Sequence, residues 1–195
     1  DFNDYISKIK SRSINNFNTG LAGTLQKYTC QSGVFRLAAK YLPEQEPAVY
    51  QEALDLGLFV WKDDKLVVPT EPKDMRKPCL EFFMKKAGEA EHPVCADIFR
   101  QVGEYLAVTW EETDYILEPE AKERSLFGRL VKTPACFRLM CEGAKNRVTD
   151  LKQYAADGGL ANTALMKQLE AHPDYTVAQF AQAVGAIYFG CLGLV

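Results

Sequence analysis

Histidine is scarce in this 195-residue chain, and the motifs of the common enzyme classes are missing. The two histidines, His92 and His172, each precede a proline, so we expect them in loops and not beside a second metal ligand. There is no HExxH, GxGxxG, GxxxxGKS/T or GxSxG motif. We therefore predict no enzymatic activity, no catalytic residue, no metal site and no cofactor. A cysteine and a histidine that meet only in the fold remain an open alternative.

The six cysteines include no CxxC pair. The closest two, Cys136 and Cys141, are five residues apart and point to different faces of a helix. Most cysteines lie in apolar periodic segments, which predicts buried, reduced thiols in a cytosol-like compartment, with a disulfide framework as the less favoured alternative. Long apolar runs are also missing, since none reaches the roughly 18 residues that span a bilayer. We expect no membrane partner.

What the chain does have is enough apolar residues for a core and an uneven charge. Apolar residues make up 47% and aromatic residues 11%, which fits one domain or two small ones. The net charge is −3, but residues 44–120 hold eighteen acidic and eight basic residues, while residues 121–152 hold three acidic and eight basic ones. The alternation is either chance on solvated faces or an acidic face of one copy meeting a basic face of another, with some basic residues left for an anion.

Helical periodicity runs through most of the chain after a polar start. The apolar positions 34, 37, 38, 41 and 42 predict a helix that Pro43 ends, and Pro47 and Gly57 bound the next one. Further helices are predicted over 79–89, 92–106, 109–117 (opened by a Thr109-x-x-Glu112 capping box), 121–131, from Thr133-Pro134 past Leu151 to 158–159, over 162–172 and from 176.

One stretch, LFVWKDDKLVVP (58–69), breaks this pattern. Two short apolar runs flank a charged turn, which predicts a β-hairpin at 58–68. The predicted fold class is therefore mainly α, a multi-helix core with one small β-hairpin and extended terminal arms. We divide it into an N-terminal arm (1–22), the helical core (23–175), and a C-terminal helix with an apolar tail (176–195). The tail packs either into its own core or onto a neighbouring copy.

The basic residues of 121–152 interleave with apolar positions. Arg138 and Lys145 are seven apart and share one stripe of the predicted helix. Guanidinium groups suit phosphate oxygens, so this stripe is one wall of a possible phosphate-binding groove. The alternative is an ordinary solvated helix face.

Three segments resemble the coat proteins of flexuous filamentous plant viruses of the potyvirus type. The first is FRLAAKYLPEQEPAVYQEALDLGLFVWKDDK (35–65), in which an aromatic-led helix precedes GLFVW, similar to the family's GLMVW-like stretch. The second is FRQV (99–102), similar to the family's FRQIM helix. The third, KTPA…GAKNR (132–147), is similar to a family stretch with Thr-Pro-Ala and, later, Gly-Ala-x-Asn-Arg. Together they touch about half of the chain.

The resemblance implies a helical core with one β-hairpin, arms that pack on adjacent subunits, and an RNA groove held by a Ser, an Arg and an Asp. By position the Arg is Arg100. The Asp falls near Ser125, so the aspartate itself is not reproduced, and Thr70 is the hydroxyl nearest to the family's Ser. The spacing from 100 to 133 is also shorter than in the family.

The expected function is a structural subunit that self-assembles into a helical filament around single-stranded RNA. Its partners would be copies of itself and RNA, bound through the phosphate backbone without sequence specificity, and its locations the virion and the host cytoplasm. The candidate RNA-binding residues are Arg100, Arg124, Ser125, Arg129, Arg138, Lys145 and Arg147.

A second function remains open. LDLGLFVW…CLEFF resembles a winged-helix-like unit, and VTDLKQYAADGG and TVAQFAQAV resemble helices of a death-fold-like bundle. On that interpretation the chain is a protein-interaction module of host signalling assemblies.

Overall fold

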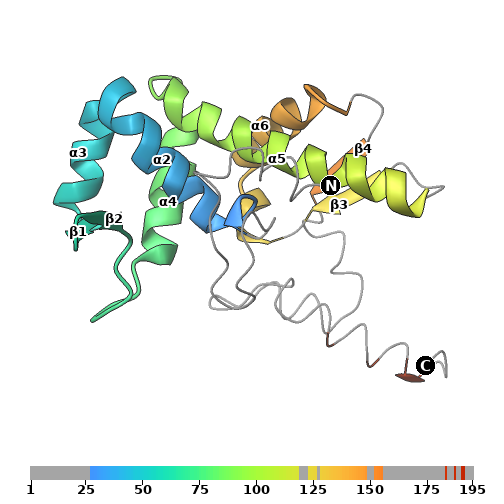
Figure 1. Ribbon diagram of the computed structural model, residues 1–195, viewed down its shortest axis with the longest axis horizontal. Coiled ribbons are helices and arrows are strands. Elements are labelled where there is room, and N and C mark those ends of the chain that lie inside the picture. Colours follow the sequence, from blue (N-terminus) through green and yellow to red (C-terminus); the bar gives the residue numbers. More distant parts are fainter. Residues whose placement is uncertain are drawn as a thin grey trace.

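The computed structural model describes residues 27–118, 123–126, 128–148 and 152–155, and four single positions near the C-terminus. The described residues form five α-helices, one antiparallel hairpin and one parallel strand pair (Figure 1). The prediction of a mainly α fold with a small β-hairpin is confirmed. None of the described helices is long and apolar enough to cross a membrane.

Helices α2 (Gln31–Gln45) and α3 (Pro47–Asp55) open the described part of the chain. Helix α2 continues two residues past Pro43, so the predicted stop at this proline is slightly early. Helix α3 begins with Pro47 in its first turn, as expected, because a first-turn proline lacks an N–H that would have no partner there. Gly57 follows the helix with a φ of +65°, a conformation that glycine adopts readily.

The hairpin forms where it was predicted. Strands β1 (Val60–Lys62) and β2 (Lys65–Val67) pair antiparallel, with Val60 opposite Val67. Asp63 and Asp64 form the two-residue turn, and their φ values of 49° and 59° are both positive, as a type I′ turn requires.

Helices α4 (Arg76–Ala87) and α5 (Pro93–Leu117) follow the hairpin. Two helices were predicted in 92–117, but α5 is continuous, so the predicted start at Thr109 is wrong. Thr109 does not cap a new helix: its hydroxyl donates back to the Tyr105 carbonyl at 3.5 Å, and Thr113 does the same to Thr109 at 2.8 Å. A threonine bonded to the preceding turn is compatible with an unbroken helix.

The prediction of a helix over 121–131 is also wrong. Residues Glu123–Leu126 form strand β3, which pairs parallel with β4 (Lys152–Ala155), and Arg129–Val131 form the short 3-10 helix η3. Helix α6 (Pro134–Lys145) starts after Thr133, as predicted, but ends before Leu151 because the chain must leave the helix to reach β4. The partner of β3 lies well along the sequence, so local periodicity does not reveal this pairing.

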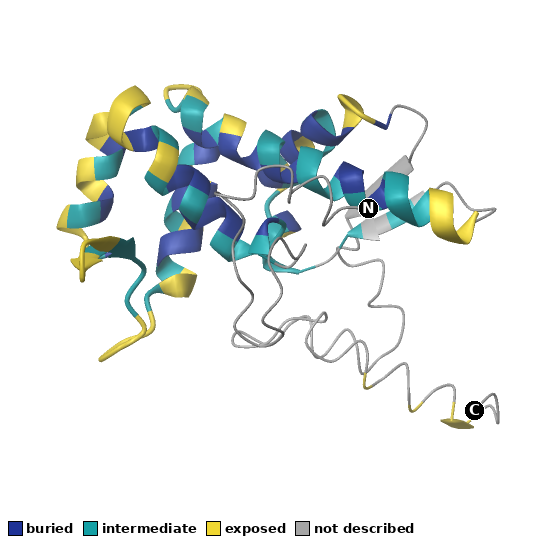
Figure 2. Ribbon diagram, viewed as in Figure 1, coloured by how far each residue is buried: buried dark blue, intermediate teal, exposed yellow. Residues whose placement is uncertain are grey.

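Helix α5 is central to the packing, and its contact with α6 depends on two glycines. A Cβ on Gly103 would lie 2.0 Å from the Met140 carbonyl oxygen, and one on Gly143 would lie 1.8 Å from the Arg100 carbonyl oxygen. The two helix backbones therefore touch directly. Around this contact the largest fully buried side chains fill the core between α2, α4, α5 and α6: Leu42, Leu80, Phe83, Ile98, Phe99 and Leu139 (Figure 2).

Several sequence predictions lie outside the described residues. These are the N-terminal arm over 1–22, the helix over 162–172 and most of the apolar tail. The four described C-terminal positions, Ala183, Ile187, Gly190 and Cys191, are helical and exposed. Ala183 and Ile187 fall within the C-terminal helix predicted from 176, and Gly190 and Cys191 fall within the predicted apolar tail.

Candidate nucleic-acid interface

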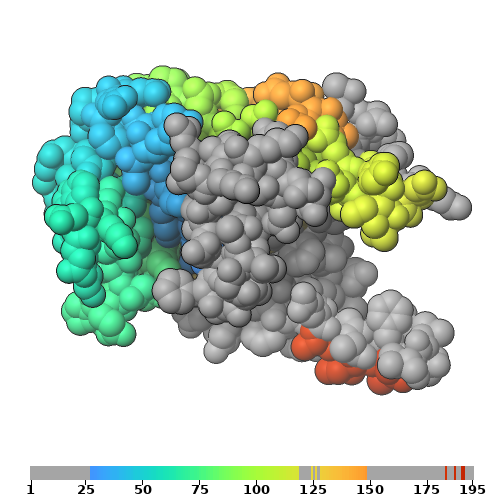
Figure 3. Space-filling model, in the orientation of Figure 1, coloured from blue at the N-terminus to red at the C-terminus, as the bar shows by residue number. Residues whose placement is uncertain are grey.

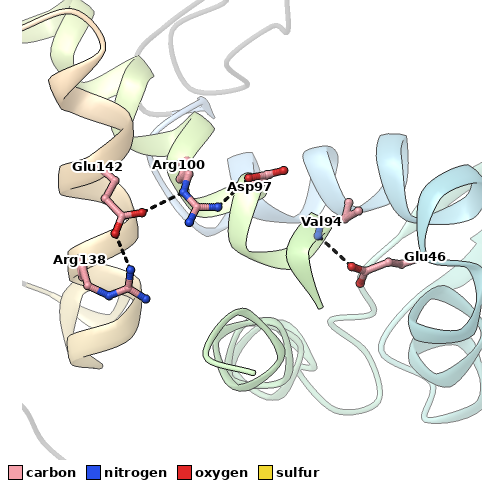
Figure 4. A network of polar contacts seen from close by, with 6 residues as sticks. All are labelled: Glu46, Val94, Asp97, Arg100, Arg138 and Glu142. Carbon is pink, nitrogen blue, oxygen red and sulfur yellow. Dashed lines mark hydrogen bonds and ion pairs between the residues drawn. The ribbon is translucent and has the colours of Figure 1, made fainter. Parts of the chain in front are cut away.

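Arg100 lies where α5 crosses α6, in a network of ion pairs (Figure 4). Its Nε donates to Oε2 of Glu142 on α6 at 3.0 Å, and its Nη1 donates to Oδ1 of Asp97 at 2.7 Å. Arg138 binds the other carboxylate oxygen of Glu142. Desolvation acts to raise the pKa of Glu142, but hydrogen bonds from the two arginines outweigh it and hold the pKa below its usual value. Glu142 therefore brings Arg100 and Arg138 together.

Arg124 and Arg147 also bind carboxylates of α5. Arg124, at strand β3, pairs with Asp114, and both side chains are mostly buried. Arg147 follows α6, and its Nη2 lies 2.8 Å from Oε2 of Glu111. Four of the predicted RNA-binding arginines are thus engaged by carboxylates of the same chain, and three of them tie β3 or the α6 region to α5. Such pairs fix the geometry of the helices and compensate the arginine charge.

The other three candidates differ from these four. Lys145 is exposed and has no ion-pair partner among the described residues. Ser125 lies in β3, and its side chain is outside the description. Arg129 opens η3 and lines a cavity of about 470 Å³ together with Lys27 and Arg76. The structure therefore does not gather the seven candidates at one place.

Lys27 and Arg76 are the basic residues that the sequence analysis missed. Lys27 lies just before α2, Arg76 is the first residue of α4, and Arg129 lies in η3. No local pattern joins three segments so far apart in the chain. The sequence offered one weak signal: Lys27, Arg76 and Arg129 each lie within a few residues of the start or end of a predicted helix.

The polar contacts at the start of α5 are structural. Glu46, between α2 and α3, accepts a hydrogen bond from the Val94 N–H at 2.8 Å, and so caps α5 from a distant segment (Figure 4). The same carboxylate accepts a weak hydrogen bond from the Cys95 thiol at 3.7 Å. His92 precedes α5, and its Nδ1 lies 3.6 Å from Oε2 of Glu46.

The thiols have little nucleophilic character where they are buried. Cys79, Cys95 and Cys136 are buried, whereas Cys30 and Cys141 are half-buried and Cys191 is exposed, so the prediction that most cysteines are buried holds for three of the six. Burial raises the pKa of Cys79 to about 12, and burial with the nearby Glu46 raises that of Cys95 to about 12. A thiol with such a pKa stays protonated at neutral pH and is a poor nucleophile. Within the described ranges, no three histidine, cysteine or carboxylate side chains gather as a metal site would require.

Besides the single Ile187, two groups of large apolar side chains are exposed among the described residues, and they lie at opposite ends of the fold formed by α2 to α6 (Figures 1 and 2). At the hairpin end, Leu56 is 55% and Trp61 is 64% exposed. At the far end of α5, Tyr115, Ile116 and Leu117 are 83%, 70% and 69% exposed. Figure 3 shows this end of α5 at the surface of the molecule. Below, these are called the hairpin patch (Leu56, Trp61) and the α5 patch (115–117).

Comparison with known proteins adds no relative. No protein-family model matches the chain, and neither the curated proteins nor the solved structures contain a significant match. The resemblance to filamentous coat proteins therefore stays a prediction from short motifs.

Proposed function

We propose that this chain is a structural subunit that polymerises head to tail into a helical filament around single-stranded RNA. The observation that carries the proposal is the placement of the hairpin patch and the α5 patch at opposite ends of the fold formed by α2 to α6. The mainly α fold with one hairpin is also the one that the coat-protein resemblance implies.

Two different apolar patches at opposite ends favour an open assembly. When one patch of a subunit binds the other patch of the next, the contact is heterologous, and it repeats without limit unless the rotation closes a ring. Fully burying a side chain such as Ile116 contributes roughly 1.5–3 kcal/mol, so a few such residues per contact give a useful driving force.

RNA would be held through its phosphates by the basic residues that have no internal carboxylate partner. Among the described residues these include Arg129 and Lys145, with Lys132 beside η3. Arg100, Arg124, Arg138 and Arg147 would reach phosphate only by sharing or leaving their carboxylates. Contacts of this kind ignore base identity and weaken as salt rises.

Electron microscopy and nuclease protection test the proposal on the whole chain. Purified protein mixed with single-stranded RNA at low salt should form flexible rods, and RNA inside them should survive nuclease digestion. The rods should lose RNA as the salt concentration rises. A monodisperse monomer at high protein concentration, with no rods and no protected RNA, would overturn the proposal and favour the signalling-module alternative.

A further inference from the structure

The cavity of about 470 Å³ between the start of α2, the start of α4 and η3 has a cationic wall. Its described lining holds Lys27, Arg76 and Arg129 and no carboxylate. We propose that this cavity is a binding site for a phosphomonoester, the terminal phosphate of a small molecule such as a mononucleotide. The three cations would bind the phosphate oxygens.

The charge of the cavity matches that of the group it would bind. Arg76 forms a two-pronged ion pair with Asp74, in which Nη2 lies 2.6 Å from Oδ2 and Nε lies 2.9 Å from Oδ1. Asp74 therefore compensates one of the three positive charges and leaves two. A phosphomonoester carries between one and a half and two negative charges near pH 7, as the second pKa is about 6.

Two of the cations are available for a ligand. Neither Lys27 nor Arg129 has an ion-pair partner among the described residues. The third, Arg76, is held in place by Asp74, whose Oδ1 also accepts a hydrogen bond from the Arg76 backbone N–H at 2.9 Å. The remaining N–H groups of the Arg76 guanidinium stay available, and their planar arrangement suits phosphate.

The remaining wall supplies a donor for oxygen atoms and an apolar surface for an organic group. Ser32 contributes a hydroxyl group, and Leu80 and Leu130 contribute apolar side chains. The segment that carries Lys27 and Thr29 is held tightly on α2, because a Cβ on Gly33 would lie 2.1 Å from the Tyr28 carbonyl oxygen. The volume falls in the usual range of small-molecule sites, about 300–1,000 Å³.

No carboxylate competes at the adjacent end of α2. Its first turn holds no acidic residue, and Cys30 at its start makes no side-chain capping bond. The positive end of the helix adds to the field of the three cations. This contribution is secondary, since the cavity and its three cations define the site.

Calorimetric titration of the unassembled protein tests this site. The probes are inorganic phosphate, AMP, and adenosine, which keeps the base and sugar of AMP but lacks the phosphate. We expect AMP to bind with a dissociation constant below about 1 mM, equivalent to about −4 kcal/mol. Adenosine should bind at least tenfold more weakly. Absence of measurable AMP and phosphate binding to protein that is folded by circular dichroism would overturn the proposal.

Matched variants separate the cavity from general charge attraction. Lys27→Gln and Arg129→Gln should each weaken AMP binding tenfold or more. Lys85→Gln removes an equal charge from an exposed residue of α4 that does not line the cavity, and it should change the affinity less than twofold. Equal losses in all three variants would overturn the proposal, because they would indicate unspecific attraction.

The site does not depend on the filament, and the two proposals fail separately. A titration with a short oligouridylate that lacks a terminal phosphate provides the distinction. If this RNA binds and AMP does not, the small-molecule site is refuted while the filament proposal stands. If AMP binds but neither RNA nor rods are found, the filament proposal is refuted and the cavity site stands.

Discussion

At the residue scale, the structure assigns most of the predicted RNA-binding arginines an internal role. Arg100 spans Asp97 and Glu142, and through Glu142 it is linked to Arg138. The sequence placed these residues correctly on helices but did not reveal that carboxylates face them. Arg129 and Lys145 differ, because no described carboxylate pairs with either. Basic residues from one short segment of the chain therefore differ: some form internal ion pairs, and others have no described carboxylate partner.

Replacing Arg100 tests its structural role. Arg100→Met keeps the stem and removes the charge, and it should lower the free energy of unfolding by about 0.5–1 kcal/mol, the usual worth of a half-exposed ion pair. Urea denaturation at pH 7 measures this change. The control is Lys73→Met, which removes an exposed charge without a described partner from the loop before α4 and should leave stability unchanged. An equal effect of both variants would contradict a structural role for Arg100.

Two buried thiols and one partly buried tyrosine hydroxyl predict a loss of stability at alkaline pH. Burial raises the pKa of Cys79 and of Cys95 from 9.0 to about 12, and burial with neighbouring tyrosines raises that of Tyr105 from 10.0 to about 12. The unfolded chain loses these protons first, so the folded state binds more protons between pH 9 and 12. Stability is therefore complete below pH 9 and falls as the pH rises, by up to about 1.4 kcal/mol per pH unit for each group.

Urea denaturation at pH 8, 9.5 and 10.5 measures this slope. The double variant Cys79→Ala/Cys95→Ala removes two of the three groups and should show a shallower decline, whatever its absolute stability. A variant that declines as steeply as the wild type would show that these thiols do not titrate as expected.

At the element scale, close backbone contact holds α5 on α6. Gly103 and Gly143 lie at this contact, and each admits the carbonyl of the other helix where a methyl group would collide. The contact sets where Arg100 meets Glu142, and so it positions the ion-pair network. Glycine inside a helix usually lowers its stability, so these two are explained by packing and not by local preference.

Substituting either glycine should separate the two helices. Gly103→Ala and Gly143→Ala should each lower the free energy of unfolding by about 3 kcal/mol, since a backbone oxygen cannot move aside as a side chain can. Thermal and urea denaturation measure the loss. Gly190→Ala is the control, because a Cβ there meets nothing within 4 Å. Retention of wild-type stability in both variants would refute the direct backbone contact.

The hairpin turn can be improved. Asp63 and Asp64 adopt positive φ values, and a type I′ turn favours Asn-Gly at these positions. The double variant Asp63→Asn/Asp64→Gly should stabilise the protein by about 0.5 kcal/mol, which raises Tm by about 1–2 °C. Calorimetry measures the shift. Gly57→Ala should instead lower the stability, because Gly57 has a φ of +65°. A higher stability of this variant would contradict the described backbone conformation.

At the scale of the whole molecule, two exposed apolar patches at opposite ends favour assembly with copies. The proposal predicts that damage to either patch stops growth while the fold persists. Trp61→Ser and Ile116→Ser should each reduce assembly at least tenfold at a given protein concentration, measured by sedimentation. Lys62→Ser, next to Trp61 on the hairpin, is the matched control and should assemble normally. If both patch variants assemble like wild type, the head-to-tail contact does not use these residues.

The sequence by itself determined the helical class, the hairpin with its turn, and the proline-led starts of α3 and α6. These features follow from spacing within about ten residues, which periodicity and turn residues encode locally. Only the tertiary structure decided that β3 pairs with β4, that α5 runs unbroken, which carboxylate meets each arginine, and that Lys27, Arg76 and Arg129 share a cavity. Each of these depends on partners far away in the chain, and local preference carries no information about such partners.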